Sequence, residues 1–212
     1  MGLYIGNTRY CPVIEKAETL PYDAEIEYIE STGTQYINTE IVPDINTCVI
    51  IRGRYNEYVA TSVLCGARVG TGNTNRFFPW GCEGANQKNR FVIGNSSFYS
   101  DVNYGSTIYN LYFNDPLHNV VLNGSRLGTY SSTSFSVSSN NPLYLFGTSG
   151  YGTNLYLSKA RVYFFVIIKN NAVVRDYIPV RVGQVGYMYD RVSGTLFSNA
   201  GTGSFTLGSD VT

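Results

Sequence analysis

The sequence is poor in charged residues and in the residues that favour helices. Asp, Glu, Lys and Arg make up only 14% of the 212 residues, and their charges sum to zero. Helix surfaces usually carry Glu, Lys, Ala and Leu. These residues are sparse here, while Thr, Val, Ile, Phe and 19 Tyr are plentiful. The composition therefore indicates β structure throughout, in a chain long enough for one sizeable domain.

Several functions and locations are disfavoured by what the chain lacks. Nucleic-acid binding depends on Lys and Arg neutralising phosphates, and no basic run is present, so no nucleic-acid partner is expected. The longest apolar run, Val162–Ile168, has the length of a strand, so no membrane insertion is expected. The start Met1-Gly2-Leu3-Tyr4 shows no signal peptide. We therefore expect synthesis in a bacterial cytoplasm and release only by lysis or a dedicated machine.

The cysteines do not have the spacing of a metal site. No C-x-x-C pair occurs, and the single histidine, His118, lies far from every cysteine in the sequence. Reduced, buried thiols are the expectation for a chain folded in a cytoplasm, and disulfides remain an alternative. The four residues are Cys11, Cys48, Cys65 and Cys82.

No catalytic constellation is apparent, and we expect no enzyme. Glu25 and Glu27 would share one face of a strand, as the paired carboxylates of glycoside hydrolases do, but charge at a sheet edge also blocks aggregation. His118 has no recognisable nucleophile partner. No cofactor is expected except calcium, for which Asp101-Val102-Asn103 and Asn114-Asp115 supply the only plausible oxygen donors.

Short strands separated by turns run along the whole chain. Thr47–Tyr55 is a long predicted strand, and Ala160–Ile168 is so apolar that we expect a central strand buried on both faces. Asn123-Gly124 is the strongest hairpin signal. About a dozen strands with a turn every 8–12 residues are typical of a β-sandwich.

Two segments near opposite ends have clear strand and turn patterns. In Thr34–Ile41, Gln35, Ile37, Thr39 and Ile41 alternate with polar and aromatic residues, which predicts a half-buried strand. Near the other end, Val185–Tyr189 and Thr195–Ser198 flank a turn in which Gly194 can take the positive φ that closes such a hairpin.

The wider segments Glu27–Ile41 (EYIESTGTQYINTEI) and Tyr177–Phe205 (YIPVRVGQVGYMYDRVSGTLFSNAGTGSF) carry a family resemblance. They resemble the opening and closing segments of laminin-G-like, concanavalin-A-like jelly-roll domains found in gut bacteria and their phages. The resemblance implies an all-β, concanavalin-A-like jelly-roll β-sandwich over residues 23–212. It implies no activity, because jelly rolls host many functions. We expect both segments to be structural and to touch no ligand.

Residues 1–22 are expected to be a short N-terminal arm. The pattern of Gly2–Ile14 predicts one hairpin with Gly6-Asn7 at its turn, and the polar segment Glu15–Pro21 indicates a linker. One hypothesis is that the arm docks onto a partner; the alternative is an ordinary hairpin folded back on the sandwich. The candidate docking residues are Leu3, Tyr4, Ile5, Tyr10, Val13 and Ile14.

The resemblance and the missing enzyme motifs favour a non-catalytic structural protein of a phage virion. The role would be a head or tail fibre, decoration or receptor-binding component on the virion surface, associated with itself as a homo-oligomer or with other virion proteins. The alternative is a carbohydrate-binding module on the surface of a bacterium or secreted from it.

A glycan receptor is the ligand that either role suggests. Sugar sites on such folds use an aromatic ring against the apolar face of the sugar and amides for its hydroxyls. Aromatic residues beside polar loops are candidates for such a site, although Phe77, Phe78 and Trp80 also fit a sandwich core. The candidate ligand-binding residues are Trp80, Phe78, Tyr104, Tyr130, Tyr151 and Asn103.

Overall fold

The computed structural model is all-β in every residue that it describes. It describes residues 3–5, 8–10, 19–57, 59, 61–70, 75–83, 88–101, 107–131, 135, 140–150 and 155–211, with only the backbone of 3–5, 8–10 and 83. Within these ranges the chain forms strands and no helix. None of these described ranges therefore holds a helix with the length and apolarity needed to span a bilayer. The predicted all-β class is confirmed.

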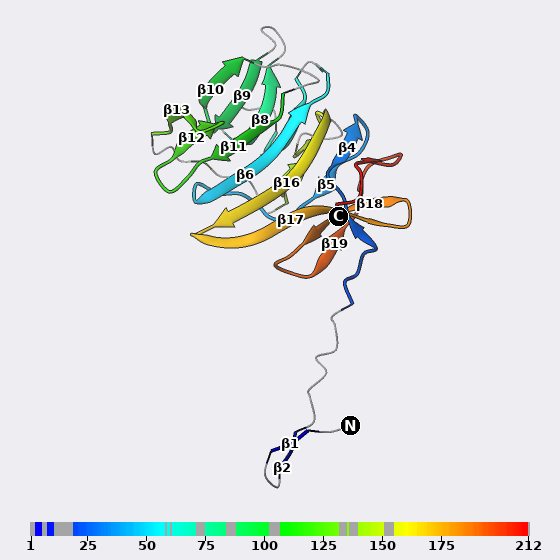
Figure 1. The fold of residues 1–212 in the computed structure, drawn as a ribbon. Coiled ribbons are helices and arrows are strands. Elements are labelled where there is room, and N and C mark those ends of the chain that lie inside the picture. Colours follow the sequence, from blue (N-terminus) through cyan, green and yellow to red (C-terminus); the bar gives the residue numbers. More distant parts are fainter. Residues whose placement is uncertain are drawn as a thin grey trace.

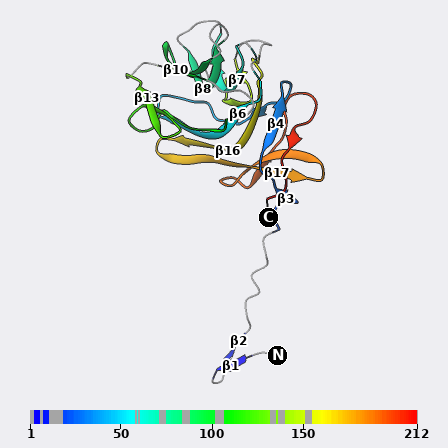
Figure 2. The same cartoon turned by 45° about the horizontal axis from the view of Figure 1, so that its top comes forward.

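Two antiparallel sheets pack face to face (Figures 1 and 2). The smaller sheet consists of β5 (Ile37–Asn38), β7 (Val63–Arg68), β8 (Arg76–Glu83), β9 (Lys88–Ile93), β10 (Ser96–Asp101), β14 (Tyr144–Leu145) and β15 (Thr148–Ser149). Its order is β10-β9-β8-β7-β14-β5, and β15 joins β7 as the sheet's parallel pair.

The larger sheet forms the second layer. Its strands are β3 (Ala24–Glu25), β4 (Ile29–Thr32), β6 (Thr47–Tyr55), β11 (Tyr109–Phe113), β12 (Asn119–Leu122), β13 (Ser125–Thr129), β16 (Lys159–Lys169), β17 (Ala172–Val182), β18 (Val185–Asp190), β19 (Thr195–Phe197) and β20 (Thr206–Leu207). The main order is β13-β12-β11-β6-β16-β17-β18-β19, with β4 beside β16 and β20, and β3 beside β17. The twenty labelled strands thus make one sandwich and a separate β1–β2 pair.

Alternation along the strands places one face of each sheet in the core. On β6, Val49, Ile51 and Tyr55 are buried, whereas Arg52 between them is exposed. Residues two apart in a strand share a face, so the opposite set on β6 lies on the outer face of the larger sheet. Aromatic rings fill much of the core, and the largest fully buried ones are Trp80, Tyr177, Phe77, Phe91, Phe113, Phe146 and Phe165.

Strand β16 is central in its sheet but is not buried on both faces, so that part of the prediction is wrong. Val162, Phe165 and Ile167 face the core, while Val166 and Ile168 on the outer face are only half-buried. The smaller sheet covers one side of β16, and no described strand covers the other. An apolar run predicts a central strand here but does not establish that two layers cover it.

The two end segments meet in space. The Thr202 N–H donates to the Thr34 carbonyl at 3.0 Å, and the Ala200 N–H donates to the Tyr36 carbonyl at 2.8 Å. Gly201 between them approaches the backbone so closely that an added Cβ would lie 2.1 Å from the Thr34 oxygen. The chain therefore closes the sandwich by joining the loop at 200–202 to the segment at 34–36.

The predicted Asn123-Gly124 hairpin is present between β12 and β13. Asn123 and Gly124 have φ values of 49° and 80°, as the favoured two-residue hairpin turn requires. Strand β10 was missed, because its sequence SSFYSD is mostly polar and offers no alternating apolar residues. It pairs with β9 at the edge of the smaller sheet, where polar side chains are common.

At the N-terminus, β1 (Leu3–Ile5) pairs with β2 (Thr8–Tyr10), as the hairpin prediction required. Neither pairs with any other described strand. Val13 and Ile14 lie outside the described residues, as do the side chains of Leu3, Tyr4, Ile5 and Tyr10. The docking role of the arm therefore stays a prediction.

Candidate functional site

The predicted aromatic platform is wrong for the three residues that the structure describes with side chains. Trp80 is fully buried, and its indole N–H donates to Asn89 Oδ1 at 2.7 Å inside the core. Tyr130 is buried against Phe98 and Phe113. Phe78 is buried in a small separate cluster. Sequence position beside polar loops did not reveal which way these rings point.

The remaining predicted ligand residues are not placed by the structure. Tyr104, Tyr151 and Asn103 lie outside the described residues and stay predictions. The calcium hypothesis also stays a prediction, because Asn103 and Val102 are among them. No three His, Cys, Asp or Glu side chains converge within the described ranges.

A pocket of about 720 Å³ lies on the outer face of the larger sheet, where the strands β6, β11 and β16 begin or end. Its floor includes Cys48, Tyr112 and Ile168, which alternate with core residues on their strands. We call it the Asn-rich pocket. It is lined by Ile45, Asn46, Cys48, Tyr112, Asn114, Asp115, Pro116, His118, Ile168, Asn170 and Asn171.

Tyr112 supplies an accessible aromatic ring to this pocket. Its exposed fraction is 42%, in contrast to the buried rings of the predicted platform. The exposed side chains of Asn46, Asn170 and Asn171 lie around it and make no hydrogen bond to another described residue. Planar amides beside an open aromatic ring can bind a ligand that has both an apolar face and hydroxyl groups.

The loop from β11 to β12 is built by left-handed residues. Asn114 and His118 have φ values of 57° and 58°, and the Asn170 and Asn171 turn opposite adopts the same conformation. Asn tolerates this conformation better than most residues. The Asn114 side chain donates to the Ile45 and Thr47 carbonyls, both at 2.8 Å, which ties the loop to β6. A positive φ strains the backbone of any residue other than glycine. Such strained residues persist where surrounding contacts fix the chain, and they are concentrated at binding sites.

These contacts determine the tautomer of His118. The amide nitrogen of Asn114 donates to two carbonyls, so its Oδ1, 2.9 Å from His118 Nδ1, accepts a hydrogen bond from the ring N–H at Nδ1. In the neutral imidazole, Nε2 then carries a lone pair and can accept a hydrogen bond. The only histidine thus presents an acceptor at the pocket.

The ionisable groups of the pocket are set for binding rather than for nucleophilic attack. Burial raises the pKa of the Cys48 thiol to about 12, and the nearby Asp115 adds to this, so the thiolate is scarce near neutral pH. Burial would raise the pKa of Asp115, but hydrogen bonds from Asn119 and Leu117 outweigh it and lower that pKa. Asp115 is therefore a fixed negative charge and a hydrogen-bond acceptor.

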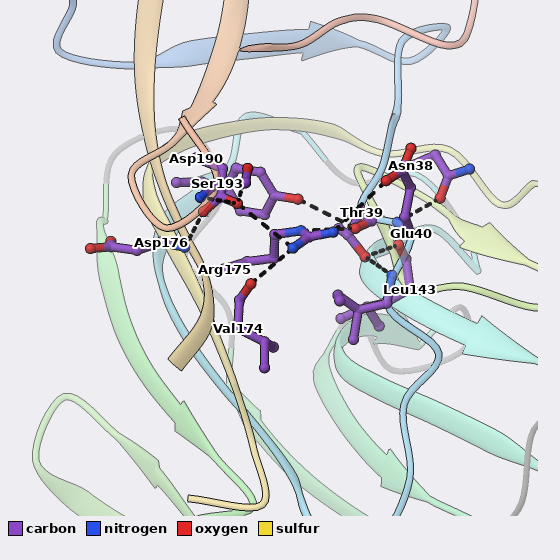
Figure 3. Close-up of polar contacts among 11 residues, drawn as sticks. Asn38, Thr39, Glu40, Leu143, Val174, Arg175, Asp176, Asp190 and Ser193 are labelled. Carbon is purple, nitrogen blue, oxygen red and sulfur yellow. Dashed lines mark hydrogen bonds and ion pairs between the residues drawn. The ribbon is translucent and has the colours of Figure 1, made fainter. Parts of the chain in front are cut away.

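A second, smaller pocket of about 320 Å³ lies between the two end segments. Arg175 lines this pocket, and Figure 3 shows it with Asp190 and Ser193 on one side and Thr39 and Glu40 on the other. Arg175 Nε donates to the Thr39 carbonyl at 3.2 Å, and Nη1 donates to the Val174 carbonyl at 3.0 Å. This side chain therefore fastens β17 to the segment that follows β5.

Asp190, the last residue of β18, pairs with Arg175, and we call these two residues the clamp. The Asp190 side chain is fully buried, 3.7 Å from Arg175 Nη1. Its carboxylate accepts hydrogen bonds from the Asp176 N–H, the Val192 and Ser193 N–H groups and the Ser193 hydroxyl. Because the Asp190 carboxylate is already hydrogen-bonded to these partners, we interpret the clamp as a structural contact between strands. The Asn-rich pocket is the better candidate for a ligand site.

The paired carboxylates considered for hydrolysis lie elsewhere. Glu25 and Glu27 are exposed, and neither lines the Asn-rich pocket or the smaller pocket. Glu25 accepts a hydrogen bond from the Tyr22 hydroxyl at 3.1 Å.

Comparison with known proteins gives a likeness of fold. No family model and no curated protein matches the chain. Among solved structures, a "putative carbohydrate binding protein" from Bacteroides ovatus is similar, with a TM-score of 0.56 and 8% sequence identity. The match covers 86% of this chain and 60% of that protein, so this chain spans well under the full length of its neighbour. At this identity the likeness concerns architecture alone, and it establishes the chain as a jelly-roll-like β-sandwich.

Proposed function

We propose that this chain is a non-catalytic carbohydrate-binding domain, and that the Asn-rich pocket is its glycan site. The observation that carries the proposal is the exposed ring of Tyr112 beside the unengaged amides of Asn46, Asn170 and Asn171. The fold shared with the Bacteroides ovatus protein supports the same class of ligand.

The proposed contacts divide between the two faces of a sugar. The Tyr112 ring packs against the apolar C–H face, which removes apolar surface from water. The amides donate to and accept from the hydroxyl groups, while His118 Nε2 and the Asp115 carboxylate accept from them. A hydroxyl lost from the sugar would leave these pocket groups unpaired, which provides selectivity.

The chemistry of the pocket supports binding without hydrolysis. Glycoside hydrolases generally use two carboxyl groups, about 5–10 Å apart, and Asp115 is the one carboxylate lining this pocket. The lowered pKa of Asp115 also makes it a poor proton donor near neutral pH.

The setting in which the domain acts remains a proposal from sequence. A glycan site suits the receptor-binding component of a phage virion, and it equally suits a module on a bacterial surface. Detection of the chain by mass spectrometry in purified particles would support the first setting, and its detection on washed bacteria free of particles would support the second.

The test of the proposed site is the substitution Tyr112→Ala. We expect at least a tenfold weaker affinity for glycans found by array screening and measured by titration calorimetry, because an exposed ring contributes about 1.4 kcal/mol or more when a ligand covers it. Tyr99→Ala is the matched control, since Tyr99 has the same exposed fraction of 42% on the other sheet. Unchanged affinity in Tyr112→Ala, or an equal loss in both variants, would contradict the assignment.

A further inference from the structure

A second feature of the same outer face is a group of three arginines. Arg52 and Arg54 point outward from β6, and Arg161 lies beside them on β16. Arg54 and Arg161 are direct cross-strand partners, so their side chains project from the same side of the sheet. We call Arg52, Arg54 and Arg161 the arginine cluster. It lies toward the opposite end of β6 from the Asn-rich pocket.

Aromatic rings support two of these guanidinium groups. The Arg161 guanidinium lies 3.7 Å from the centre of the Tyr28 ring, and that of Arg52 lies 5.5 Å from the centre of the Tyr163 ring. The two tyrosine rings contact each other edge to face at 5.7 Å. Stacking of this kind orients a guanidinium so that its edge can pair with a planar anion, and at Arg161 the Glu30 carboxylate already occupies Nε and Nη2.

The positive charge of the cluster is only partly neutralised. Glu30 pairs with Arg161 at 2.6 Å, and it is the carboxylate in register with that residue on β4. Glu57, two residues beyond the end of β6, pairs with Lys159 instead. No acidic partner faces Arg54 among the described residues, and its Nε is buried without a hydrogen-bond partner. Three arginines therefore face one carboxylate, and the cluster with Glu30 has a net charge of +2.

Two like charges directly opposite each other in a sheet destabilise it, and the sheet nevertheless holds Arg54 against Arg161. An anion bound between the two guanidinium groups would relieve this repulsion, and it can approach because Arg54 as a whole is only half-buried. Carboxylate and sulfate groups have the planar or multidentate oxygens that arginine pairs with best.

We propose that the arginine cluster binds the carboxylate or sulfate groups of an acidic polysaccharide. The choice of a polysaccharide rests on the proposed function of the Asn-rich pocket. Cys48 in that pocket precedes Arg54 by six residues on one strand, about 20 Å at ~3.3 Å per residue. The half-buried apolar residues Ile50 and Val166 lie between. One extended chain can therefore contact both ends of this face.

The test measures binding of the intact chain to heparin, which carries sulfate, and to polygalacturonate, which carries carboxylate. Dextran serves as a neutral polysaccharide probe, and single-stranded DNA serves as a polyanion that is not a polysaccharide. We expect Arg54→Gln to weaken the binding of one or both acidic polysaccharides at least tenfold. Arg126→Gln, an exposed arginine on β13, is the control and should leave it unchanged.

Glu30→Gln separates recognition from simple damage to the fold. Its removal frees Arg161 from its partner, so we expect acidic polysaccharide to bind severalfold more tightly, although the variant loses an ion pair. Arg54→Gln should also raise the melting temperature of the unliganded protein, because it removes the repulsion. Weaker binding in Glu30→Gln, or unchanged binding in Arg54→Gln, would overturn the proposal.

The remaining outcomes distinguish the two sites. Loss of glycan binding in Tyr112→Ala with no effect of Arg54→Gln would leave the Asn-rich pocket standing and reject the arginine cluster. The reverse pattern would reject the pocket and keep the cluster. Binding of single-stranded DNA as tightly as heparin would reject a polysaccharide as the partner.

Discussion

Asp190→Ala is expected to lower the free energy of unfolding by about 3–5 kcal/mol, which is the usual cost of removing one member of a buried ion pair. The substitution leaves the Arg175 guanidinium without its buried carboxylate. It also removes the acceptor of three backbone N–H groups and of the Ser193 hydroxyl. Unfolding in urea, followed by tyrosine and tryptophan fluorescence, measures the change.

Two further variants keep this prediction testable. Asp190→Asn preserves an acceptor oxygen and should lose less stability, so it provides the measurement if the alanine variant does not fold. Asp210→Asn removes the carboxylate of an exposed pair with Arg181 and should leave the unfolding midpoint unchanged within error. A shift in Asp190→Ala as small as that of Asp210→Asn would refute the clamp.

Gly201→Ala is expected to cost about 2–4 kcal/mol, from overpacking and the loss of hydrogen bonds that it forces. The new methyl group would lie 2.1 Å from the Thr34 carbonyl oxygen, so the two backbones must separate. That movement breaks the bonds from Thr202 to Thr34 and from Ala200 to Tyr36.

The control for this variant is Ser204→Ala in the same loop. Ser204 is exposed, and an exposed substitution of this size should change stability by less than about 0.5 kcal/mol. Thermal unfolding of both variants, with circular dichroism as the readout, compares them directly. Equal melting temperatures would mean that the end segments do not need their close approach.

Strand positions were predictable where alternation and turn chemistry agree. Thr47–Tyr55 was predicted with the bounds that the structure gives β6, and Asn123-Gly124 was predicted as a hairpin. Both signals are local, since they depend on side-chain period and on residues that accept positive φ. The resemblance to jelly-roll domains pointed to the same sandwich.

The ligand-facing residues were not predictable in the same way. Alternation separates the two faces of a strand, but it does not say which face a second sheet covers, so Trp80 was expected beside a ligand and lies in the core. Tyr112 was not singled out, because its pocket depends on the turn at Asn170, far along the chain. The cross-strand pairing of Arg54 with Arg161 likewise depends on a register that no local pattern encodes.

The meeting of the end segments also has a consequence for the order of folding. The Thr34 side chain hydrogen-bonds to Thr202, 168 residues later in the chain. Strand β4 likewise pairs with β16 and β20, which are both far along the sequence. During synthesis the opening segment therefore leaves the ribosome long before its partners exist, and its edge stays open to other strands. Contacts between such distant residues slow the folding of β-sandwiches, so closure of this sandwich should be the late, rate-limiting event.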